Sequence, residues 1–303
     1  MVEWNGFFLK FMPSPLFLEN GLFRFTQPKA FEDEQEALPD WRYESFAKED
    51  YEVAASDAEA LGIGRDLPKD ILETALMYPF PAHRFTPETA PGLFRMDKEP
   101  FKTEEEHDTW IAKRAVELCQ EKADKEVGIF SLTKVESNLM WKKYGGERSG
   151  VMICFDADHP FFQSEMREVE YTESPISVSV NSGWVRIGGQ RLNVDDVRDG
   201  YIERVPPRLL FQKRLGWAEE REWRRLELLE NAEKQAGRDY NGHDVYLFRV
   251  PAAAVVAVFY GSCAADEMVQ EGLHKIDQSM QWQHVHVFKY EAKPDGERRT
   301  KIR

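Results

Sequence analysis

The sequence predicts an α+β fold with a mixed or antiparallel central sheet of short strands and helices packed around it. Short aromatic and β-branched runs alternate irregularly with helical patterns, and few of them have the spacing of β-α-β units. Of the 303 residues, 42% are hydrophobic, which is enough for a large core. We therefore expect a single composite domain over residues 1–292, with an expanded helical and loop region at about 41–100.

The expected strands are short and run along the whole chain. The first two are rich in aromatic residues, and proline and acidic loop residues follow each of them. A later buried run ends at Asp156. The expected strands cover residues 6–11, 21–26, 129–133, 151–155, 167–171, 222–228, 245–250, 255–260 and 284–290.

The clearest helix covers residues 103–127. Thr103 and Glu106 form a capping box, and apolar residues then recur with helical period until Gly128 ends the pattern. Two further helices are expected at 137–144 and 264–280. Residues 293–303 are polar and rich in Lys and Arg, which predicts a flexible basic tail.

Composition excludes several classes of protein. Lys and Arg number 40 against 54 Asp and Glu, and the resulting net charge of −14 disfavours non-specific nucleic-acid binding. The three cysteines, Cys119, Cys154 and Cys263, form no paired motif, so neither a disulfide framework nor a cysteine zinc site is indicated. No apolar run approaches the ~20 residues needed to span a bilayer. These features are typical of a cytoplasmic protein.

The stretch 213–224 is the first candidate site. If it is helical, Glu220 and Arg224 form an ordinary i,i+4 salt pair on a solvated face. If it is a strand, Glu220, Glu222 and Arg224 share one face beside Lys213, and two carboxylates converge in a cleft. One carboxylate could then bind a ribose hydroxyl and stabilise an oxocarbenium-like transition state, while the other orients a nucleophile.

Two further groups of residues carry weaker signals. Ser131 lies on the expected strand 129–133, where a hydroxyl on the polar face is ordinary by itself. His284 and His286 are expected on one strand face between Trp282 and Phe288. Two imidazoles supply only half of a tetrahedral zinc shell, so we expect an aromatic and histidine strand face without metal.

Several motifs in order resemble the bacterial domain of unknown function 2971 family. The resemblance covers about residues 8–261 and begins with Leu9-Lys10-Phe11 and an acidic loop segment at 18–36. In that loop Glu32 replaces an asparagine of the family pattern, and Glu34 and Gln35 replace a proline and a phenylalanine. The later motifs match Phe-Ser-Leu at 130–132, Met-Trp-x-x-Tyr at 140–144, Gly-Val-x-Ile-x-Phe-Asp at 150–156 and Lys-x-x-x-Trp-x-x-Glu-x-Glu-x-Arg at 213–224.

The layout of these motifs also resembles the ADP-ribosyltransferase fold. This second resemblance implies an enzyme that uses NAD and modifies an unidentified macromolecule, in a toxin or phage-defence setting. It implies that Lys10 contacts the NAD phosphates or ribose and that Ser131 orients the nicotinamide side. Glu220 or Glu222 would stabilise the ribosyl cation, and the cofactor-binding set is completed by Lys213 and Arg224.

Two alternatives to this enzyme remain. One is a catalytically inert module that binds a ligand or acts as a sensor or interaction partner on the same fold. The other is a nuclease or another hydrolase.

Overall fold

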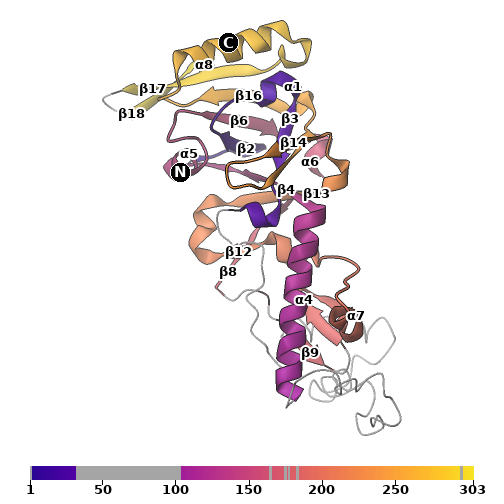
Figure 1. Ribbon diagram of the computed structural model, residues 1–303. Helices are drawn as coiled ribbons and strands as arrows, with labels where there is room; N and C mark the ends of the chain where they lie inside the picture. The colour runs from indigo at the N-terminus through magenta and orange to yellow at the C-terminus, as the bar shows by residue number, and fades with distance from the viewer. Residues whose placement is uncertain are drawn as a thin grey trace. The chain divides into compact units, whose positions relative to one another are not determined.

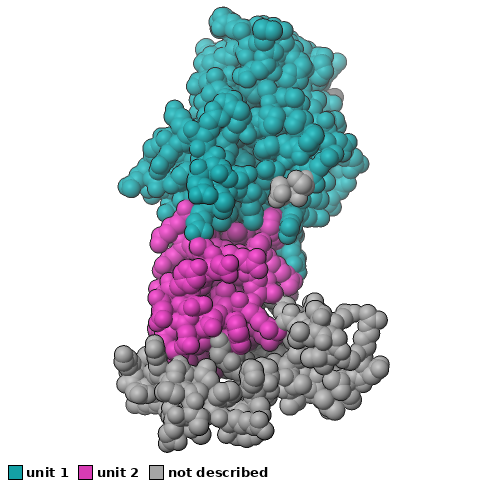
Figure 2. Space-filling model, turned by 90° about the vertical axis from the view of Figure 1, so that its right-hand side faces the viewer, with its two compact units in different colours: residues 1–31, 126–171, 213–303 teal, residues 32–125, 172–212 magenta. Residues whose placement is uncertain are grey.

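The computed structural model describes residues 2–31, 104–163, 166–173, 176, 178–181, 184–293 and 296–303 (Figure 1). The chain divides into two compact units, coloured separately in Figure 2. Unit 1 comprises Met1–Phe31, Glu126–Tyr171 and Lys213–Arg303, and unit 2 comprises Glu32–Lys125 and Thr172–Gln212. The expanded region predicted at 41–100 lies outside the described residues, and the single composite domain stays a prediction.

Unit 1 is built on an eight-stranded mixed sheet, which confirms the predicted α+β class. β16 and β17 are parallel, whereas the other neighbouring strands are antiparallel. The order along the sheet is β18 (Gly296–Lys301), β17 (His286–Lys293), β16 (Val255–Tyr260), β6 (Val151–Asp156), β2 (Phe7–Met12), β4 (Val127–Thr133), β13 (Glu222–Leu228) and β7 (Met166–Glu168).

The middle of this sheet is buried on both faces. Alternation along β2 places Phe8 in one apolar cluster with Phe130 and Phe155, and Leu9 in another with Met152. The first face is covered by α1 (Phe17–Asn20), α6 (Pro160–Gln163) and α8 (Asp266–Gln278), and the second by α5 (Asn138–Lys143).

Smaller elements complete unit 1. A three-stranded antiparallel sheet has the order β14 (Lys234–Arg238), β15 (Asp244–Arg249) and β3 (Leu22–Phe25). Short antiparallel strands β1 (Val2–Glu3) and β5 (Val135–Glu136) pair with each other. Short 3-10 helices are η1 (Pro28–Ala30), η5 (Leu215–Glu220), η6 (Leu229–Asn231), η7 (Ala252–Ala254) and η8 (Met280–Trp282).

Unit 2 has an apolar core of its own. The long helix α4 (Glu104–Glu126) contributes Ile111 and Ala115 to this core, which confirms the helix predicted at 103–127. The sheet β11 (Gln190–Asn193), β10 (Trp184–Ile187) and β9 (Val178–Asn181) contributes its apolar residues to the same core, as do α7 (Val194–Arg198) and η4 (Pro207–Phe211). The strands β8 (Glu170–Thr172) and β12 (Gln212–Arg214) form a further two-stranded sheet, and two of the three residues of each strand belong to unit 1.

Most of the segment predicted to be a basic tail forms the strand β18. Residues of β18 pair antiparallel with β17, from Phe288 opposite Lys301 to Lys293 opposite Gly296. The guanidinium of Arg299 lies 5.4–5.5 Å from three aromatic rings, those of Trp4, Phe259 and Phe288. Composition suggested solvation, but paired backbone and stacked arginine hold this segment on the sheet.

The two histidines near the C-terminus do not share a strand. Only His286 lies in β17, whereas the His284 Nε2 lies 3.1 Å from the carbonyl oxygens of Ala252 and Val255. Among the described residues, no group of three or more His, Cys, Asp or Glu side chains is arranged to hold a metal ion. Within the same residues, no helix is both long enough and apolar enough to cross a membrane.

Candidate functional site

Three neighbouring strands of unit 1 bring the predicted site residues together. Lys10 lies on β2, Ser131 on the adjacent β4, and Glu222 and Arg224 on β13, the next strand along. Arg224 is paired with Ser131, and Glu222 with Thr133. Since directly paired residues of antiparallel strands share a face, the hydroxyls of β4 lie beside the charged groups of β13.

Lys10 lies where the pairing between β2 and β4 is interrupted. β2 pairs with β4 at Leu9 and Thr133, and four residues earlier on β4 Ile129 is bridged instead to Thr26. Between these two points the Lys10 Nζ donates to the Ser131 carbonyl oxygen at 3.0 Å. The same amine lies 4.6 Å from the centre of the Phe130 ring.

The strand prediction for 222–228 is confirmed, but Glu220 does not belong to the strand. Glu220 is the last residue of η5, and Arg221 follows in the left-handed conformation with φ 43°. This turn breaks the alternation that would have placed Glu220 and Glu222 two apart on one strand. The Thr133 hydroxyl fixes the turn by donating to the Glu220 carbonyl oxygen at 2.6 Å.

The two carboxylates nevertheless meet at one lysine. The Lys213 Nζ donates to Glu220 Oε2 at 2.6 Å and to Glu222 Oε2 at 3.0 Å. Arg224 binds Glu222 with two donors, from Nε to Oε1 at 2.8 Å and from Nη2 to Oε2 at 3.1 Å. Glu220, Glu222 and Arg224 are 2%, 6% and 0% exposed, so the carboxylates are enclosed by their partners instead of lining an open cleft as predicted.

Glu220 is held by three different side chains, one of which is Lys213. Its Oε1 accepts from the Lys143 Nζ and from the Tyr144 hydroxyl, each at 3.0 Å. Trp217 lies beside this group, with its ring 3.8 Å from the Lys143 Nζ. Both carboxylate oxygens of Glu220 accept hydrogen bonds from buried or half-buried donors, so Glu220 helps to hold the cluster together.

The charge state of Glu222 follows from its surroundings. Burial raises the pKa of this carboxyl, but the nearby charge of Arg224 and then that of Lys213 outweigh burial and lower it to about 2. Glu222 is therefore a carboxylate throughout the neutral range. The pKa of Lys10 is lowered to about 8, mainly by burial, while Glu222 opposes the shift.

Ser131 supplies a polar group next to this carboxylate. Its buried Oγ makes no hydrogen bond that meets normal geometry to any residue in the described part of the chain. It still lies near enough to Glu222 to help lower the pKa of that carboxyl. A buried hydroxyl without a hydrogen bond of normal geometry is unusual in a folded protein.

Several residues of the cluster were missed by the sequence analysis. Tyr144 belongs to the Met-Trp-x-x-Tyr motif, for which the sequence predicted core packing. In the structure its hydroxyl donates a hydrogen bond to Glu220. The Tyr171 hydroxyl accepts from the Glu222 backbone N–H at 2.7 Å, across 51 residues of sequence. Neither Tyr171 nor Lys143 has a local sequence pattern that reveals its partner.

No family model, curated protein or solved structure matches this chain. The resemblances to the domain of unknown function 2971 family and to ADP-ribosyltransferases therefore stay predictions.

Proposed function

We propose that unit 1 is an ADP-ribosyltransferase-like enzyme that uses NAD and modifies a macromolecule. The observation that carries the proposal is the side-by-side position of β2, β4 and β13. The Lys10 amine reaches the Ser131 backbone from the side of Phe130, and the Ser131 hydroxyl lies next to the ionised Glu222 carboxylate. The unsatisfied Ser131 Oγ and the Lys10 amine fit a ligand that has both an amide and phosphates.

Glu222 is the catalytic group in this proposal. NAD, when bound, supplies a carbon–nitrogen glycosidic bond whose cleavage places positive charge on the ribose. A carboxylate that stays ionised in a water-poor site stabilises such charge without any proton transfer. We assign this role to Glu222 over Glu220, because Glu222 lies next to the Ser131 hydroxyl, whereas Glu220 is held by two lysines and a tyrosine.

The cations around Glu222 divide into two roles. Lys10 binds the phosphate or ribose part of the ligand, as the resemblance implies. Arg224 and Lys213 hold the Glu222 carboxylate in place through their hydrogen bonds, so we treat them as positioning residues. Ser131 orients the amide side of the ligand through its buried hydroxyl.

The experiment is incubation of the full chain with NAD labelled in its adenylate part. The expected result is release of nicotinamide and transfer of label to a macromolecule from a cell extract. Glu222→Gln should lose about 100-fold or more in rate, the usual effect of removing one charge-stabilising group. Ser131→Ala, which removes no hydrogen bond of normal geometry within the described residues, should mainly raise KM for NAD.

The matched control is Glu230→Gln, a change at an exposed glutamate of η6 beyond the end of β13. It should keep the wild-type rate. Absence of nicotinamide release by the wild-type chain, or equal rates for Glu222→Gln and Glu230→Gln, would contradict the proposal.

The enclosure of both carboxylates favours a second candidate, a binding or sensor module without turnover. Charges that are this deeply buried and paired are suited to holding a structure in one geometry. In that case NAD or a related nucleotide binds with no nicotinamide release. Ser131→Ala would then weaken binding, with no rate to lose.

A further inference from the structure

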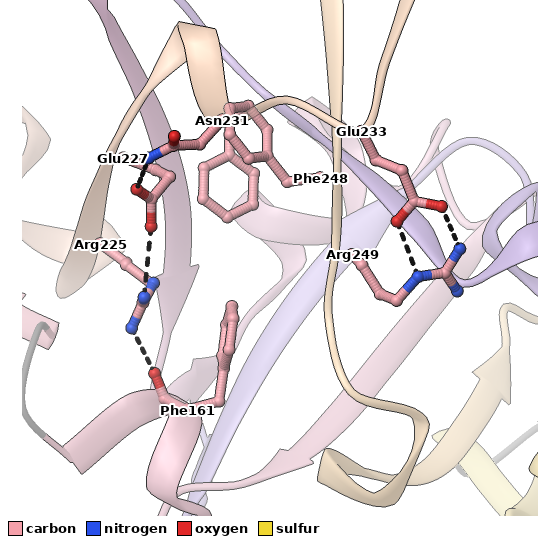
Figure 3. A pocket seen from close by; sticks show the side chains of 8 residues that line it. Phe161, Arg225, Glu227, Asn231, Glu233, Phe248 and Arg249 are labelled. Atoms are coloured by element: carbon pink, nitrogen blue, oxygen red, sulfur yellow. Dashed lines mark hydrogen bonds and ion pairs between the residues drawn. The ribbon is translucent and has the colours of Figure 1, made fainter.

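Unit 1 contains a cavity of about 290 Å³ on the face of β13 that points away from Glu222. Arg225 and Glu227 alternate with Glu222 and Arg224 along the strand, so the two pairs face opposite sides of the sheet. The cavity is lined by Phe25, Phe161, Arg225, Glu227, Asn231, Glu233, Phe248 and Arg249 (Figure 3).

Aromatic rings form one wall of the cavity. The rings of Phe25 and Phe248 lie 4.4 Å apart between their centres, and both belong to the main core of unit 1. The guanidinium of Arg225 lies 4.3 Å from the centre of the Phe161 ring. Phe25 and Phe248 are 1% and 5% exposed, so the surfaces on which a flat guest can stack are the half-buried Phe161 ring and the Arg225 guanidinium plane.

Two groups of polar side chains stand on opposite sides of these rings (Figure 3). On one side Glu227 accepts from the Asn231 amide at 3.0 Å and from Arg225 at 3.4 Å. On the other side the Arg249 Nε donates to Glu233 at 2.7 Å. Two arginines and two glutamates balance in charge, so the cavity offers donors and acceptors without a net charge.

We propose that this cavity binds a neutral, planar heterocycle of the purine nucleoside class. A guest with a net charge would meet equal numbers of like and unlike charges, whereas a neutral base gains from both stacking and edge hydrogen bonds. The volume is close to the lower limit of about 300 Å³ for ordinary small-molecule pockets, which suits a nucleoside better than a dinucleotide. The proposal is independent of the proposed function, because the residues of the two sites do not overlap.

The test is titration of the full chain with adenosine, followed by calorimetry and by saturation-transfer NMR. We expect a Kd of about 1 mM or tighter. Saturation should reach the base protons more strongly than the ribose protons, because the base is the part that stacks. Glu227→Gln and Phe161→Leu should each weaken binding about fivefold or more.

Two matched variants keep the test specific. Glu230→Gln changes a neighbouring exposed glutamate outside the cavity, and Glu222→Gln changes the opposite face of β13. Both should bind adenosine like the wild-type chain, and circular dichroism checks that every variant is folded. The proposal is overturned if adenosine shows no binding at about 10 mM. It is also overturned if Glu227→Gln and Phe161→Leu bind normally, or if only Glu222→Gln loses binding, which would place the base in the candidate site.

Discussion

The two faces of β13 carry the same kinds of charged side chains in different surroundings. On one face Glu222 and Arg224 are nearly or fully buried and joined by two short hydrogen bonds. On the other face the side chains of Arg225 and Glu227 are 15% and 28% exposed, and their contact is 3.4 Å long. Each pair consists of one glutamate and one arginine of the same strand, so the two pairs differ in burial and not in residue type.

This difference decides what each pair contributes. Water screens the Arg225–Glu227 pair and competes for its hydrogen bonds, so the pair adds little to stability. Around Glu222 no water replaces a lost partner, and removal of one charge leaves others buried and unpaired. The buried face therefore tolerates change poorly, while the face with the cavity is free to exchange its partners for a ligand.

Replacing Glu222 or Glu227 by alanine should show the difference between the two faces most clearly. Glu222→Ala leaves Arg224 and Lys213 without their shared carboxylate and should lower the free energy of unfolding by about 3–5 kcal/mol. Glu227→Ala, on the same strand, should cost less than about 1 kcal/mol. Urea denaturation at neutral pH measures both values, and equal losses would show that burial does not separate the faces.

The next largest effect should be on the free energy of unfolding at acid pH. The pKa of Glu222 is lowered to about 2 in the folded chain, so its contribution is present above the unfolded value near 4.5 and is lost as pH falls toward 2. This contribution is on the order of 3 kcal/mol. In Glu222→Gln the free energy of unfolding should fall less steeply as pH decreases. An unchanged slope in that variant would exclude Glu222 as the source.

The smallest effect concerns Lys10, whose pKa depends on the charge of Glu222. After reductive methylation with a carbon-13 label, the Lys10 signal should titrate near pH 8, well below the ~10.4 of ordinary lysines. Glu222→Gln should lower this value further, because Glu222 opposes the effect of burial. Lys10→Arg identifies the signal, and a titration together with the other lysines would contradict a buried amine.

Local patterns predicted much of the fold. β13 and β16 have the predicted bounds, and α4 differs by one residue at each end, because periodicity and caps are local signals. Lys10, Ser131 and Glu222 lie on neighbouring strands. That they form one site was predicted from the family resemblance as well as from spacing, and it stays a prediction.

The rest depends on contacts that no local pattern encodes. The left-handed Arg221 moves Glu220 out of the strand, and its preference for that conformation is not visible in the sequence. The three strands β9, β10 and β11 are each four residues long, too short for a clear period of two. Cross-sheet partners such as Tyr171 are fixed only when β13 and its neighbours have assembled.

The central position of β2 has a consequence for the newly made chain. Lys10 reaches the ribosome exit 121 residues before its partner Ser131, and the facing residues of β6 follow later still. At about 5–20 residues per second, the aromatic strand Phe-Phe-Leu-Lys-Phe-Met waits roughly 6–24 seconds before Ser131 is made. Lys10 is the one charge in that run, and a charge inside an apolar strand limits its association with other chains. The amine that lies beside Ser131 in the folded unit is thus also a gatekeeper against aggregation during synthesis.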